Sequence, residues 1–317
     1  MIKEIFSVNI LAANPAIDVT YEMPGKLAPG KLRRAEKQVM GVGGKGIIAA
    51  ETLALLGIDH KLYTFAGGGT GELLKEKLAK DGVNLYLSET KAETRISTRI
   101  LSDAGMTTIA GTGGRIRAGE YMRLTKKIDE EEPDGTVCFL LAGKAPDGVD
   151  SDSFATFIKR RGEKFKTVLY CDGPELRLGL RQKPWLAFLT GKAIVDYLQY
   201  EAKTFDELHH AARRIYAETG SSVICRTEKS EYVYCGDGGF MSAAMRAPER
   251  HIATIGDGDV FLAVFLWIYI YSGSLEAAMR CAVSAADAKA KLPGAEMPPK
   301  EALLSRADEV EIKEYKL

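Results

Sequence analysis

Two glycine-rich segments, each directly before a stretch of helix length, contain the residues best suited to chemistry on a phosphate group. The first is residues 41–46 (GVGGKG), which lead into a helix predicted over 46–56 and include Lys45. Glycines let the backbone approach a ligand closely, and a helix start offers unpaired N–H groups and a positive dipole. The segment predicts an anion site, and a flexible turn with a solvated lysine is the alternative.

The second segment is residues 256–259 (GDGD), which open a very apolar helix predicted over 260–273 and place Asp259 in its first turn. N–H groups at a helix start stabilise charge on a phosphoryl group in transfer, and a nearby aspartate can accept the proton of an attacking hydroxyl. The alternative is that Asp259 only complements the dipole of a core helix. A third cluster, residues 67–71, is interpreted as a turn and helix cap.

Apolar segments of strand length alternate along the chain with amphipathic segments of helix length. Strands are predicted over 5–12, 62–66, 137–142, 167–171, 185–189, 222–226 and 231–235, and helices over 46–56, 71–81, 151–161, 204–219 and 260–273. This alternation is typical of βαβ units, so we expect an α/β fold in which helices cover both faces of a mostly parallel sheet.

Two regions interrupt the alternation. Residues 16–40 and 84–112 are short, alternating and rich in turn signals, which predicts a small antiparallel sheet set apart from the main one. With no linker or internal repeat, we expect a single domain over 1–317 with this sheet as an excursion that forms a lid. The exposed face of the lid could also make a homodimer contact.

The bulk composition limits the classes of partner. Lysine plus arginine and aspartate plus glutamate both total 43, so no global field favours nucleic acid or a membrane surface. Five scattered cysteines suggest reduced core residues, and residues 1–9 lack the features of a signal peptide, so we expect a cytoplasmic protein. A nicotinamide-dependent dehydrogenase is a weaker hypothesis, because the early glycine cluster follows the lid rather than the first strand.

Four motifs occur together and in order along nearly the whole chain: NPAID at 14–18, GGKG at 43–46, TRI at 94–96 and GDGD at 256–259. Together they resemble the phosphofructokinase B branch of the ribokinase-like carbohydrate kinases. That resemblance implies a three-layer α/β/α fold with a small β-sheet lid. It also implies transfer of a phosphoryl group from ATP, with Mg²⁺, to a hydroxyl of a sugar phosphate of the fructose 1-phosphate, fructose 6-phosphate or tagatose 6-phosphate class.

The resemblance also implies roles for individual residues. Asp259 would be the general base, beside an anion hole formed by Gly256, Asp257 and Gly258. The residues implied in binding the sugar phosphate are Asp18, Lys31, Arg33, Gly43, Gly44, Lys45, Arg95 and Lys144. Those implied in binding the nucleotide are Arg226, Thr227, Gly256 and Gly258.

The chain departs from the family pattern mostly on the nucleotide side. Residues 189–194 (LTGKAI) lack the asparagine and glutamate of the family's KPNxxE, and residues 225–232 lack the glycines of its SLGxxG turn. On the sugar side, Ile48 replaces an asparagine, and Asp257 adds a carboxylate beside the expected phosphoryl path. Its charge would oppose phosphate binding unless it binds metal or turns outward. Two hypotheses follow: an active sugar-phosphate kinase, or an impaired relative that binds a sugar phosphate or nucleotide as a sensor or partner protein.

Overall fold

The computed structural model describes residues 7–132, 138–227, 230–247 and 255–316. Strands and helices alternate along most of the chain, and the strands form two separate sheets of very different size. Among the described residues, no helix is both long and apolar enough to cross a bilayer.

The large sheet has ten strands in the order β14-β13-β12-β11-β10-β9-β8-β1-β4-β5. The seven strands from β11 to β5 in this order run parallel to one another. The other three, β12, β13 and β14, pair antiparallel at the opposite edge. The parallel strands are β1 (Val8–Ala12), β4 (Leu62–Ala66), β5 (Leu85–Glu89), β8 (Cys138–Ala142), β9 (Lys166–Tyr170), β10 (Leu186–Leu189) and β11 (Ser222–Arg226). The antiparallel ones are β12 (Tyr232–Gly236), β13 (Gly239–Met245) and β14 (Val310–Tyr315).

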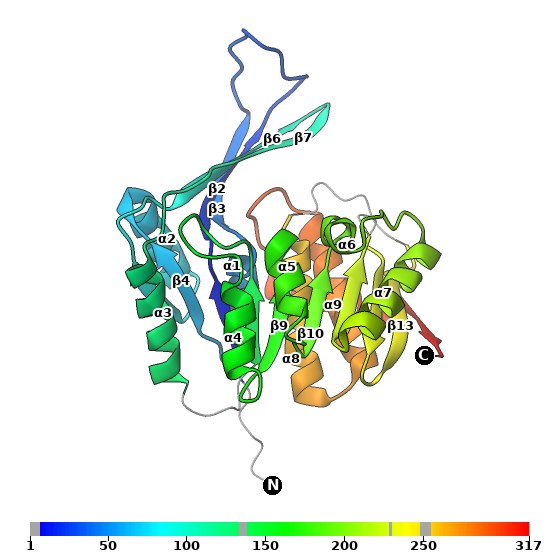
Figure 1. Cartoon of the computed structure of the whole chain (residues 1–317). Helices are drawn as coiled ribbons and strands as arrows, with labels where there is room; N and C mark the ends of the chain where they lie inside the picture. The colour runs from blue at the N-terminus through cyan, green and yellow to red at the C-terminus, as the bar shows by residue number, and fades with distance from the viewer. Residues whose placement is uncertain (1–6, 133–137, 228–229, 248–254, 317) are drawn as a thin grey trace.

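Helices cover both faces of this sheet and enclose two apolar cores (Figure 1). One core is packed by α1 (Ile47–Leu56), α2 (Gly68–Lys80), α8 (Asp257–Ser272), α9 (Leu275–Ala290) and α10 (Lys300–Leu303). The other is packed by α3 (Ala118–Glu131), α4 (Ser153–Arg161), α5 (Gly173–Leu180), α6 (Gly191–Leu198) and α7 (Phe205–Thr219). The sheet is therefore buried on both sides, which is why its central strands are continuous apolar runs rather than alternating ones.

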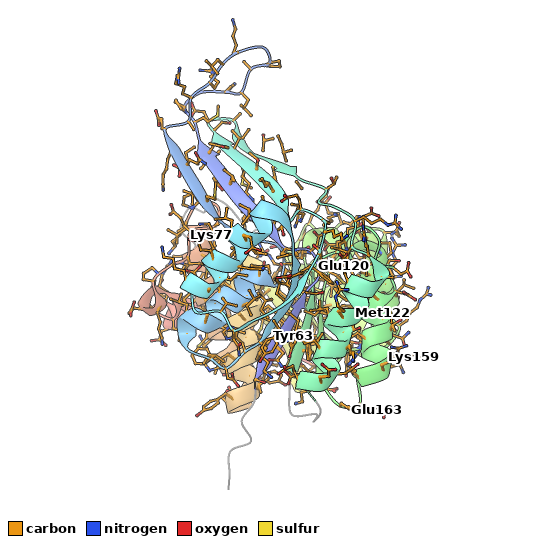
Figure 2. All side chains as sticks on the ribbon, turned by 90° about the vertical axis from the view of Figure 1, so that its left-hand side faces the viewer. Tyr63, Lys77, Glu120, Met122, Lys159 and Glu163 are labelled. Carbon is orange, nitrogen blue, oxygen red and sulfur yellow. The ribbon has the colours of Figure 1, made fainter. Side chains whose placement is uncertain are left out.

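The small sheet, called the lid below after its predicted role, has the order β3-β2-β6-β7, with β2 parallel to β6 and the other pairs antiparallel. Its strands are β2 (Ala16–Glu22), β3 (Lys37–Gly43), β6 (Arg95–Ser102) and β7 (Gly105–Ala110). Figures 1 and 2 both show these strands projecting beyond the body of the molecule.

The lid has two chemically different faces, because residues paired across neighbouring strands point the same way. Asp18 pairs with Gly41 on one side and Ser97 on the other. The opposite face carries Ile17 opposite Ile96, and Val19 opposite Met40. One face of the lid is thus polar and the other apolar.

The predicted alternation of strands and helices is confirmed for every segment, although the first residues of the strands predicted over 5–12 and 137–142 lie outside the described residues. Four details were wrong or missed. The small sheet, predicted to be antiparallel, is mixed, because β2 pairs parallel with β6. Strand β5, predicted within the lid, pairs parallel with β4 at the edge of the large sheet. Residues 68–71 form the first turn of α2 rather than a preceding turn, and β13 and β14 were not predicted.

Candidate active site

The start of helix α8 faces the start of helix α1 at the carboxyl edge of the parallel strands. The backbone N–H of Gly46 donates a 2.6 Å hydrogen bond to Oδ1 of Asp259, so this carboxylate joins the two predicted anion-binding segments. Strands β1 and β8 lie side by side there, while the chain continues from them toward opposite edges of the sheet. Such a topological switch point is where open α/β sheets bind ligands.

Asp259 is buried, with 5% of its surface exposed. Burial is the main cause that raises its pKa to about 7, opposed by the hydrogen bond from Gly46 and the charge of Lys45. A carboxyl group with a pKa near neutrality can take a proton from a hydroxyl and release it again. The carboxyl group of Asp259 can therefore gain or lose a proton near neutral pH.

The GGKG segment brings its backbone close to the sheet. Gly46 has a positive φ of 88°, and a β-carbon there would lie 2.7 Å from the β-carbon of Ala142, so only glycine fits. Lys45 forms a 2.8 Å ion pair with Asp172, which follows strand β9, and its ammonium lies 4.7 Å from the ring centroid of Tyr170. The lysine reaches the site already paired with a carboxylate.

Asp18 lies at the base of the lid, buried against the GGKG segment. A β-carbon on Gly43 would lie 1.9 Å from Oδ2 of Asp18, so the glycine makes room for the carboxylate. Asp18 also forms an ion pair with Arg99 on the neighbouring strand. Burial raises the pKa of Asp18, and the positive charge of Arg99 opposes that rise. Arg99 was missed by the sequence analysis, although it lies four residues beyond Arg95 on the same face of β6.

Arg95 lies on the polar face of the lid, two residues before Ser97. Its guanidinium donates to the carbonyl of Asn14 and to the hydroxyl of Ser97, both at 3.1 Å. Burial lowers the pKa of this guanidinium, partly offset by the charge of Asp18. Arg95, Asp18 and the GGKG segment are thus brought together.

The other predicted cations of the sugar side lie apart from this cluster. Lys31 and Arg33 are exposed in the segment between β2 and β3, where Arg33 donates to the carbonyl of Lys26 at 3.1 Å. Lys144 is exposed in the loop after β8. Lys31 and Arg33 do not meet Arg95 in this arrangement of the lid, while Lys144 follows a strand whose end lies at the site.

Asp257 is neither turned outward nor left unpaired. Its carboxylate forms a buried 2.9 Å ion pair with Arg226, the last residue of β11. Burial lowers the pKa of Arg226, but the charge of Asp257 and the hydrogen bond to it help to raise it above its ordinary value. Arg226, which was expected to touch the nucleotide, therefore lies directly beside the start of α8, and Thr227 follows it in the chain. The charge of Asp257 is neutralised within the protein.

The site fits a nucleotide phosphate better than it fits a metal ion held by the protein alone. At Gly256 φ is 74°, and a β-carbon would lie 2.6 Å from Cδ1 of Ile48, so the turn packs closely against α1 and only glycine fits there. In the parts of the chain that the structure describes, no three His, Cys, Asp or Glu side chains are grouped as metal ligands. Mg²⁺ commonly takes one or two carboxylates and completes its shell with phosphate oxygens and water. An ion here would be held mainly through the nucleotide.

Comparison with known proteins agrees with this geometry. Residues 4–302 match the family model described as "pfkB family carbohydrate kinase". The chain is 26% identical over 306 residues to a 1-phosphofructokinase of Haloferax volcanii, covering 94% of this chain and 96% of the relative. It is 25% identical over 274 residues to a D-tagatose-1-phosphate kinase of Bacillus licheniformis, covering 86% of this chain and 88% of that one.

The fold is also that of a solved sugar-phosphate kinase. The structure of phosphofructokinase-2 from Escherichia coli in complex with substrates and products superposes with a TM-score of 0.87 at 21% identity, covering 95% of this chain and 98% of that one. This likeness confirms the predicted ribokinase-like α/β architecture with its small second sheet.

The chain belongs to the pfkB family of carbohydrate kinases. The family resemblance drawn from the four motifs is thereby confirmed, and so is the prediction of a sugar kinase. The roles of the individual site residues remain predictions.

Proposed function

We propose that this protein transfers a phosphoryl group from ATP to a hydroxyl of a phosphorylated sugar. The observation that carries the proposal is the bridging position of Asp259, which accepts the N–H of Gly46 at 2.6 Å at the start of α8 and has a pKa of about 7. A base of this pKa at the meeting point of two helix N-termini suits an alcohol acceptor and an anionic donor.

In the proposed reaction, Asp259 takes the proton of the acceptor hydroxyl as its oxygen attacks the phosphoryl group. The backbone of Gly256, Asp257 and Gly258 then stabilises the negative charge that develops on that group. Mg²⁺ bound with the nucleotide would supply further charge neutralisation on the phosphate oxygens. Arg226, which ends β11 beside this turn, and Thr227, which follows it in the chain, are proposed to form the nucleotide side of the site.

The sugar phosphate is proposed to bind between the large sheet and the polar face of the lid. Asp18 would hold sugar hydroxyls, Gly43 and Gly44 would pack against the ring, and Lys45 and Arg95 would face the anionic groups. Lys31 and Arg33 would join them when the lid closes, and Lys144 would reach them from the loop after β8. Several converging cations are what a dianionic phosphate requires, and arginine adds bidentate geometry.

The test is ADP release from MgATP with a panel of acceptors. The panel contains fructose 1-phosphate, fructose 6-phosphate, tagatose 1-phosphate and tagatose 6-phosphate, with the unphosphorylated sugars as controls. We expect turnover with at least one phosphorylated sugar, and none with its unphosphorylated form. Turnover only with unphosphorylated sugars would reject a phosphorylated acceptor.

A second candidate, a protein that binds a sugar phosphate or nucleotide without efficient transfer, is favoured by one observation. Two of the cations at the site already have internal partners: Lys45 pairs with Asp172, and Arg226 pairs with Asp257. A sugar phosphate that raises the melting temperature while the whole panel releases no ADP would support this candidate.

We also propose that two copies associate through the apolar face of the lid. On that face Met40, Ile96 and Ile109 are 41%, 45% and 59% exposed, and grouped exposed apolar side chains are typical of interaction surfaces. A cytoplasmic location stays a prediction.

A further inference from the structure

Lys289, on helix α9, is a lysine with no solvent exposure that lies against the turn at the start of helix α8. Its ammonium donates a 2.7 Å hydrogen bond to the carbonyl of Gly294. Its Cε lies 3.4 Å from the position that a β-carbon on Gly256 would take. Lysine is almost never fully buried unless it is paired. None of the roles proposed above uses this charge.

The surroundings of Lys289 are rich in charge. It interacts electrostatically with Asp257 and Asp259 on α8, Glu51 on α1, Arg99 on β6 and, from the lid base, Asp18. Burial lowers the pKa of Lys289 to about 8, and the carboxylates, Asp257 first, oppose that fall. At neutral pH the side chain therefore still carries its positive charge.

A second buried cation lies on the other side of the same turn. Arg226 pairs with Asp257 at 2.9 Å, and these side chains are only 7% and 3% exposed. The Nη1 atom of Arg226 lies 3.3 Å from the position that a β-carbon on Gly258 would take. Two buried cations thus lie against the turn at 256–258: Arg226 is ion-paired with Asp257, and Lys289 interacts with the same carboxylate electrostatically.

We propose that Lys289, Arg226 and Asp257 form one buried charge triad with a net positive charge, which positions the turn at 256–258 and stabilises negative charge on the phosphoryl group in transfer. The inference rests on the kinase function proposed above. Charges fixed in a poorly solvated site act strongly on charge that develops nearby, because little solvent reorganises around them. The three residues act through the turn and are therefore positioning residues.

The alternative is that Lys289 only tethers the segment after α9 through the carbonyl of Gly294. Lys289→Met separates the two possibilities, because it keeps the length of the side chain and removes its charge. We expect kcat per folded molecule to fall at least about tenfold, while KM for the sugar phosphate changes less than about twofold. Lys289→Arg, which keeps the charge, is expected to retain more of kcat than Lys289→Met.

The matched control is Lys300→Met. Lys300 also donates to a backbone carbonyl, that of Leu56 at 3.0 Å, but at the end of α1 remote from Gly46. The kcat of the Lys300→Met variant should stay within about twofold of that of the parent protein. If Lys289→Met lowers only the melting temperature and leaves kcat per folded molecule unchanged, the tether is sufficient and the triad is rejected.

Variants that change the net charge of the triad test it even if Lys289→Met does not fold. The variants are Arg226→Gln, Asp257→Asn and their combination, and the readout is the Kd of MgATP by calorimetry. We expect weaker binding in Arg226→Gln, which leaves Asp257 unpaired, and tighter binding in Asp257→Asn, each by about tenfold. The double variant should return close to the parent value.

The two proposals fail differently. A parent protein that neither turns over the panel nor binds MgATP would refute the kinase function, and the triad with it. A parent protein that turns over or binds MgATP, with single variants that shift Kd in the same direction or not at all, would refute only the triad.

Discussion

Replacement of Asp259 by asparagine tests the proposed base and its environment together. Asparagine has the same shape and can still accept the N–H of Gly46 through Oδ1, but it cannot take a proton from a hydroxyl. A positioned base contributes about 10² to 10⁴ in rate, so we expect kcat to fall by at least about 10². The Kd of the sugar phosphate should change little, because a base acts mainly in the transition state.

The same substitution has a second consequence, for stability. Burial raises the pKa of Asp259 from 3.8 to about 7. Between about pH 4 and about pH 7, Asp259 is therefore protonated in the folded state and ionised in the unfolded state. The free energy of unfolding falls as the pH rises through this range. At about 1.4 kcal/mol per pKa unit, the ionised carboxylate costs the folded protein about 4 kcal/mol at pH 8. Asp259→Asn lacks this cost.

The assays are ADP release and urea unfolding, each followed from pH 5 to pH 9. For the parent, kcat/KM should rise with pH and level off above about 7, as the base loses its proton. For Asp259→Asn the rate should be low throughout, and the gain in unfolding free energy over the parent should grow up to about pH 7. Retention of parental turnover, or a loss of stability at pH 8, would refute the reasoning.

Three further predictions concern binding and assembly. Arg95→Ala should weaken sugar-phosphate binding at least about tenfold in calorimetry by removing a charge-assisted contact; an unchanged Kd would remove Arg95 from the phosphate site. Gly43→Ala should displace Asp18, because the new β-carbon would lie 1.9 Å from its carboxylate. We expect at least about a tenfold loss of sugar affinity. The control Gly69→Ala, whose new β-carbon meets no atom within 4 Å, should bind the sugar phosphate normally. Ile109→Glu places a charge on the apolar face of the lid and should convert a dimer to a monomer in light scattering with little change in melting temperature; a parent protein that is already monomeric would refute the proposed association.

Much of the fold could be predicted from the sequence because its signals are local. Continuous apolar runs identified the central strands, and the runs of glycine identified the turns before α1 and α8. The edge of the large sheet was harder to predict. β14 has only one buried residue, Val310, and β5 has one, Ser88, so neither shows the apolar run of a central strand.

The starts of α1 and α8, with Lys45 and Asp259 in place, could be predicted from neighbouring residues, because a helix start and its glycines are local signals. Which charges meet could be known only after the chain had folded. Asp259 contacts Gly46 from far along the chain, Arg226 neutralises Asp257, Arg99 pairs with Asp18, and Lys289 is buried against the α8 turn. These contacts depend on strand order and helix packing, and no sequence spacing encodes the distance between two segments that meet only across a sheet.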